Sequence, residues 1–109
     1  MKAWSFLIIA ILFEVLGTTS MKFSDGFTRL IPSISIFVFY ALSFVFMTFS
    51  LKAIDMAVVY AVWSGVGTAC IAAIGIMYFK EPLTLAKAFF IIMIVVGALG
   101  LQITTREAL

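Results

Sequence analysis

The chain has 109 residues, of which 65% are hydrophobic and only 11% charged, against about 45–50% and about 25% in soluble domains. A soluble fold of this size cannot bury this much apolar surface. The composition therefore excludes an ordinary soluble domain and indicates a membrane protein. The chain has one cysteine, Cys70, and no histidine. We therefore expect no metal site, no cofactor, no enzyme activity and no nucleic-acid partner.

Four stretches are long and apolar enough to cross a membrane. They cover residues 3–21, 30–51, 56–79 and 85–105, each near or above the roughly 18 residues that a membrane helix requires. Because lipid cannot hydrogen-bond a backbone, such spans are helices. The sequence predicts an all-α membrane protein, with residues 1–109 forming a single domain of four transmembrane helices. Asp55 and Thr84 are placed to cap the third and fourth helices.

Glu14 interrupts the first span near its middle. It lies eleven residues after Ala3 and eight before Lys22, which places it about 16 and about 12 Å from the two ends of the helix. Such a carboxylate is costly in lipid and usually faces the protein interior or a watery cavity on a proton or ion path. Removal from water disfavours its charged form, so we expect Glu14 to bind a proton or a cation, one excluding the other.

Small side chains share the face of Glu14. They would let a ligand or a second helix approach closely, and ordinary helix packing is the alternative explanation. The members of this face that we regard as candidate substrate contacts are Ala10, Ile11, Gly17 and Thr18.

Aromatic residues in the second and third spans could complete a cation site. Tyr60 and Trp63 share one face of the third helix, and aromatic rings attract organic cations through their electron-rich faces. A membrane-interface position is the alternative for these two residues. In the second span, Tyr40, Ser43 and Phe44 could line the same cavity, with core packing as the alternative.

Pairs of glycines mark the third and fourth spans. Gly65 and Gly67 weaken the third helix near its middle, which would suit a conformational hinge or, equally, close packing. Gly97 and Gly100 in the fourth helix predict association with another helix through close contact.

Basic residues divide almost evenly between the two ends of the helices, so the charges do not determine one orientation in the membrane. We expect dual topology and assembly as an antiparallel homodimer, although a single, weakly determined topology is also compatible with the charges. Lys2, Lys52 and Arg106 fall at one end, and Lys22, Arg29, Lys80 and Lys87 fall at the other.

Three segments resemble the small multidrug resistance transporters, and the resemblance extends over essentially the whole chain. They are EVLGTTSMK at residues 14–22, FSDGFTRL with the following Pro32 and Ser33, and YAVWSGVG at residues 60–67. The resemblance implies an antiparallel, dual-topology homodimer in the bacterial inner membrane that exchanges protons for hydrophobic or quaternary ammonium cations. It also implies that Glu14 carries the proton and the substrate charge, that Trp63, Tyr60 and Tyr40 contact substrate, and that the fourth helix forms much of the dimer contact.

Two subtypes of that family differ just after the glutamate. Guanidinium exporters typically have a tryptophan there, whereas this chain has Gly17, as the polyspecific drug exporters do. The chain resembles the drug-exporting subtype. It departs from many members at Phe90, where they have a glycine in the packing stripe of the fourth helix. Guanidinium export and a nontransporting membrane assembly subunit are the alternatives.

Overall fold

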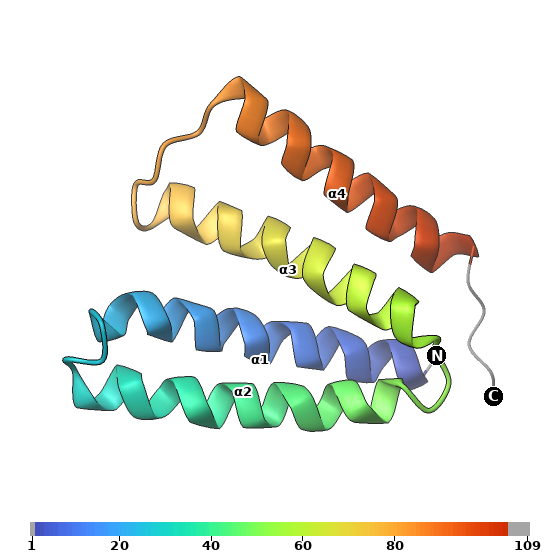
Figure 1. Cartoon of the computed structure of the whole chain (residues 1–109), viewed down its shortest axis with the longest axis horizontal. Coiled ribbons are helices and arrows are strands. Elements are labelled where there is room, and N and C mark those ends of the chain that lie inside the picture. Colours follow the sequence, from blue (N-terminus) through green and yellow to red (C-terminus); the bar gives the residue numbers. More distant parts are fainter. Residues whose placement is uncertain (1, 105–109) are drawn as a thin grey trace.

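The computed structural model describes residues 2–104, which form four helices (Figure 1). These are α1 (Lys2–Ser24), α2 (Leu30–Ser50), α3 (Met56–Met77) and α4 (Leu85–Thr104). All four are long and apolar enough to cross a membrane, which confirms the predicted all-α membrane fold.

The observed helix ends differ slightly from the expected ones. Helix α1 continues to Ser24, whose hydroxyl donates a hydrogen bond to the carbonyl of Met21. Helix α3 ends at Met77, before the expected end at Phe79, because the chain reverses at Lys80, which has a φ of 59°. The expected end of the fourth helix at residue 105 lies outside the described residues.

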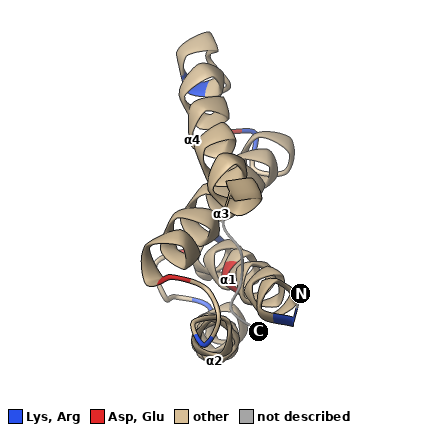
Figure 2. Ribbon diagram, turned by 90° about the vertical axis from the view of Figure 1, so that its right-hand side faces the viewer, with Lys and Arg blue, Asp and Glu red and all other residues tan. Residues whose placement is uncertain are grey.

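The helices lie side by side in the order α2, α1, α3, α4. The molecule measures 44 × 35 × 16 Å, and the view in Figure 2 shows the helices following one another in a row. Helices α1 and α3 run in the same direction, with α2 and α4 opposed to them (Figure 1). The chain is therefore a single layer of helices, and no helix is surrounded by the others.

Helix α1 packs against α2 through contacts between aromatic rings and one buried polar contact. The ring of Phe13 lies 5.8 Å from that of Phe46, and Phe6 lies 5.3 Å from Phe49. The hydroxyl of Ser43, which is fully buried, donates a 2.7 Å hydrogen bond across the interface to the carbonyl of Ala10.

The apolar core joins α1 to α3 near the amino-terminal ends of both helices. Leu7 and Val59 are almost completely removed from solvent at its centre. The full cluster of buried residues is Ala3, Leu7, Ile11, Val15, Ile54, Val58, Val59 and Val62. Further along α3 the apolar contact continues through partly buried residues only, among them Val66, Ile71 and Ile74.

The two expected helix caps have different outcomes. The hydroxyl of Thr84 accepts a 3.1 Å hydrogen bond from the backbone N–H of Lys87, so this predicted cap is confirmed. Asp55 occupies the position before α3, but its side chain makes no capping hydrogen bond, so that prediction is wrong. The side chain of Asp55 is exposed, and water can solvate its carboxylate.

Candidate functional site: a cavity between α1, α3 and α4

A cavity of about 470 Å³ lies beside the cluster that joins α1 to α3. Helices α1, α3 and α4 and the loop between α3 and α4 all contribute to its wall. The lining residues are Glu14, Thr18, Trp63, Ser64, Gly67, Thr68, Ile71, Ala72, Glu81, Lys87 and Ile91.

Glu14 reaches this cavity from the middle of α1 and is held there by a short hydrogen-bonded chain. The hydroxyl of Thr18, one turn further along, donates a 2.7 Å bond to Oε2 of Glu14. The Tyr40 hydroxyl on α2 lies 2.5 Å from the same Thr18 oxygen. Because the Thr18 hydrogen points at the carboxylate, Tyr40 donates to Thr18. Two hydroxyl dipoles are thus aligned toward the Glu14 carboxylate.

The opposite wall is formed by α3, which approaches the carboxylate closely at Gly67. A Cβ at this position would lie 3.0 Å from Oε1 of Glu14, so the glycine gives the carboxylate its room. One turn earlier, Nε1 of Trp63 is buried and donates to no atom of the described residues. A carboxylate acceptor and an indole donor thus line one cavity.

The aromatic candidates form two pairs, only part of which reaches the cavity. The rings of Tyr60 and Trp63 lie 5.5 Å apart on α3, but Tyr60 is exposed and only Trp63 lines the cavity. On α2 the rings of Tyr40 and Phe44 are stacked at 6.0 Å. Tyr40 acts on Glu14 through Thr18, whereas Phe44 is exposed.

Among the remaining candidates on α1 and α2, Ile11 belongs to the buried cluster between α1 and α3, and the others lie in the interface between α1 and α2. Ala10 and Ile11 are buried, and the hydroxyl of Ser43 is engaged by the Ala10 carbonyl. Gly17 is buried with Phe39 and Tyr40 each 3.4 Å from where its Cβ would be. None of these four candidates is among the residues that line the cavity.

The glycines on α3 and α4 have different surroundings. A Cβ at Gly65 would lie 2.8 Å from the Cβ of Ala98 and 3.3 Å from the side chain of Ile94, so Gly65 lets α4 pack closely on α3. Nothing lies within 4 Å of the equivalent position at Gly97 or Gly100. These two glycines therefore belong to an open face of α4, on which Phe90 is also exposed.

Sequence reasoning missed several residues of the cavity wall. Thr68, Ile71 and Ala72 continue along α3 from Ser64 at helical spacing, so extending the stripe of Trp63 and Gly67 would have found them. Glu81 and Lys87 come from the third loop and the start of α4. No local motif marks these two residues.

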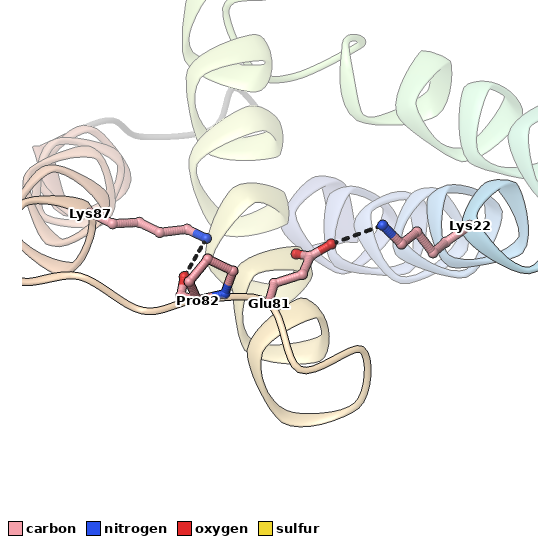
Figure 3. Close-up of polar contacts among 4 residues, drawn as sticks. All are labelled: Lys22, Glu81, Pro82 and Lys87. Atoms are coloured by element: carbon pink, nitrogen blue, oxygen red, sulfur yellow. Dashed lines mark hydrogen bonds and ion pairs between the residues drawn. The ribbon is translucent and has the colours of Figure 1, made fainter.

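An ion pair lies at one end of the cavity (Figure 3). The ammonium of Lys22, near the end of α1, lies 3.2 Å from Oε2 of Glu81. The ammonium of Lys87 instead donates a 3.0 Å bond to the carbonyl of Pro82. The loop between α3 and α4 is thereby held against α1. Among the described residues, no three histidine, cysteine or acidic side chains come together as a metal site would require.

Comparison with known proteins assigns the family. A model of the small multidrug resistance proteins matches residues 2–94. The chain belongs to the small multidrug resistance family. These proteins are membrane transporters, and the four spans make this member a multi-pass protein of the cell inner membrane.

Relatives within the small multidrug resistance family match over nearly their whole length. The uncharacterized membrane protein YvaE of Bacillus subtilis is 47% identical over 105 residues, covering 96% of this chain and 88% of YvaE. The multidrug resistance protein EbrB of Bacillus licheniformis is 41% identical, covering 99% of this chain and 91% of EbrB. The quaternary ammonium compound-resistance protein QacE of Escherichia coli is 39% identical, covering 99% of this chain and 98% of QacE.

Proposed function

We propose that this protein exports hydrophobic or quaternary ammonium cations in exchange for protons, as an antiparallel homodimer. The observation that carries the proposal is the position of Glu14. Its carboxylate comes from the middle of a helix long and apolar enough to cross a membrane, and it lines a cavity together with Trp63. Relatives named for multidrug and quaternary ammonium resistance support this substrate class.

Competition at Glu14 provides the coupling. A deprotonated carboxylate in a low-dielectric surrounding attracts a cation strongly, whereas a protonated one does not. Because one carboxylate cannot hold a proton and pair with a cation at once, each bound substrate displaces protons. If the loaded and protonated states cross the membrane and the empty charged state does not, proton entry drives cation export.

The cavity wall suits an organic cation that carries apolar groups. Apart from Glu14, its central part is made of Trp63, small residues and Ile71. The ring face of Trp63 can bind a positive charge that has little hydration, and quaternary ammonium groups are recognised in this way. The buried Nε1 of Trp63 offers a hydrogen bond to the Glu14 carboxylate once the side chains shift, since buried donors rarely remain without a partner.

Gly17 favours the drug-exporting subtype over guanidinium export. The position is buried, and even a Cβ would contact Phe39 and Tyr40 at 3.4 Å. A tryptophan there would collide with Tyr40, which lies next to the hydroxyl that bonds Glu14. The arrangement around the carboxylate therefore depends on a small residue at position 17.

The antiparallel dimer is supported by the shape of the chain and by its charges. A layer 16 Å thick leaves the cavity without a wall on one side, and a second copy would supply that wall. Gly97 and Gly100 present an open, small-residue face on α4, as close helix association in a membrane requires. Nearly equal numbers of basic residues at the two ends fit insertion in both orientations.

The test is uptake of tetraphenylphosphonium into proteoliposomes that hold only this protein, with and without an imposed proton gradient. We expect gradient-driven uptake by the wild type and none by Glu14→Gln, because an amide neither releases a proton nor carries a charge. Retained transport in Glu14→Gln would reject the coupling mechanism and favour a structural role for the side chain. Turnover of guanidinium but not of tetraphenylphosphonium would instead assign the protein to the guanidinium exporters.

A further inference from the structure

The ion pair at the end of the cavity has the composition of a second cation site. The ammonium of Lys22 lies 3.2 Å from Oε2 of Glu81 and 5.8 Å from the centre of the Phe79 ring. A carboxylate and an aromatic face around one positive charge are the groups that bind quaternary ammonium ligands. In this structure the positive charge that Glu81 and Phe79 surround is the ammonium group of the protein's own Lys22.

Glu81 is held in this position by the backbone of α3. Its N–H donates a 2.9 Å hydrogen bond to the carbonyl of Gly75, in the last turn of the helix. Its carboxylate lies directly over Gly75, where any Cβ would overlap it. Lys80 adopts a φ of 59°, a conformation unusual for a side-chain-bearing residue, and so turns Glu81 back toward the helix. The orientation of Glu81 thus depends on a strained residue and on a glycine.

The Lys22–Glu81 pair is placed where an entering or leaving substrate would meet it. Glu81 lines the cavity that contains Glu14 and also a neighbouring pocket of about 360 Å³ that includes Lys22. Thr18 and Ile71 line both spaces. Lys22 follows Glu14 by eight residues, so the ion pair lies about 12 Å further along α1.

The Lys22–Glu81 bond can be exchanged readily. Lys22 and Glu81 retain 57% and 40% of their side-chain exposure, and exposed ion pairs of this kind contribute little to stability. The lysine is also strongly hydrated, whereas a quaternary ammonium ion is not. An organic cation can therefore take the place of the lysine at Glu81 and Phe79 while the lysine turns to water.

We propose that Glu81 and Phe79 form an outer binding subsite for organic cations, in which Lys22 is the resident cation that substrate displaces. The inference rests on the proposed function, because it assigns a second binding position to the same substrates. Lys22 competes with the substrate at this subsite, and Glu14 forms the inner one.

The subsite is tested by equilibrium binding of tetraphenylphosphonium to the purified protein in detergent, in a Glu14→Gln background that removes the inner carboxylate. Adding Lys22→Met removes the competing ammonium, and we expect it to tighten the residual binding about three- to fivefold, which corresponds to the upper part of the range for exposed ion pairs. The matched control is Lys52→Met, which removes an ammonium that also lies 5.8 Å from the centre of an aromatic ring, that of Phe49, but lines neither pocket. We expect that control to change the binding less than about twofold, since it alters only a screened long-range field.

A third substitution assigns the gain to the carboxylate. Glu81→Gln keeps the backbone bond to Gly75, and we expect it to abolish the tightening that Lys22→Met produces. Equal effects of Lys22→Met and Lys52→Met would overturn the proposal in favour of a general electrostatic effect. So would weaker binding in Lys22→Met, because a purely structural ion pair loses affinity when it is broken. Gradient-driven transport by the wild type would remain intact in both cases, so the proposed function would survive the failure of the subsite.

Discussion

Replacing Thr18 by valine isolates the hydrogen bond that holds the central carboxylate. The substitution keeps the branched shape of the side chain but removes the hydroxyl that donates 2.7 Å to Oε2 of Glu14. This bond gives the carboxylate a charge-assisted hydrogen-bond donor and orients it in the cavity. Without it, we expect Glu14 to bind a cation less tightly.

The size of the effect follows from the type of hydrogen bond. A hydrogen bond to a charged group contributes about 1.5–3 kcal/mol, which corresponds to about 10- to 150-fold in affinity. We expect the dissociation constant of tetraphenylphosphonium to rise by up to this factor in Thr18→Val. In a Glu14→Ala background, which has no carboxylate, we expect Thr18→Val to produce no further loss.

The assay is equilibrium binding of tetraphenylphosphonium to the purified protein, with and without Glu14→Ala, and with Thr19→Val as the matched control. Thr19 is the next residue on α1, and its hydroxyl donates 2.8 Å to the carbonyl of Val15, away from the carboxylate. We expect wild-type affinity in this control. An equal loss of affinity from Thr18→Val in both backgrounds would refute the reasoning, because it would mean that Thr18 only shapes the wall.

Three further predictions concern packing. Ser43→Ala removes the buried donor to the Ala10 carbonyl. We therefore expect the free energy of unfolding to fall by about 0.5–1.5 kcal/mol and the affinity for tetraphenylphosphonium to stay unchanged. Lost affinity at unchanged stability would contradict this prediction. Gly65→Ala places a methyl group 2.8 Å from the Cβ of Ala98, a cost of about 1–3 kcal/mol that should lower the thermal unfolding temperature. Gly97→Ala, with no neighbour within 4 Å, should leave the protomer stable and weaken dimer cross-linking instead; unchanged cross-linking would argue against the α4 contact.

The fold could be predicted from the sequence because lipid leaves the backbone few choices. Uncharged runs of this length must be helices, and the described helices begin and end within a few residues of those runs. The pairing of Glu14 with Thr18 was also accessible, since residues four apart share a helix face. Trp63 and Gly67 share a face of α3 for the same reason.

Relations between helices could not be predicted from the sequence. Tyr40 and Thr18 are brought together by the packing of α2 on α1, and no local pattern encodes that distance. Ser43 carries a hydroxyl that could line a cavity, but this hydroxyl donates a hydrogen bond to the Ala10 carbonyl on the neighbouring helix instead. Lys22 and Glu81 lie far apart in the chain and meet only because two loops end at the same side of the layer. The sequence shows that Lys22 and Glu81 carry opposite charges, but no pattern in it indicates that their side chains meet.

The order α2, α1, α3, α4 divides the protomer into two helical hairpins. The hairpins are joined by the apolar cluster around Leu7 and Val59, near the amino-terminal ends of α1 and α3, and this cluster can act as a pivot. Glu14 and the cavity lie on the far side of the pivot, where the Lys22–Glu81 pair links one hairpin to the other. A small rotation about the pivot therefore widens the cavity most where substrate would enter. It would separate the Lys22–Glu81 pair and the ring contacts of Phe23 with Tyr78 and Phe79, and it would leave the buried cluster around Leu7 and Val59 in contact.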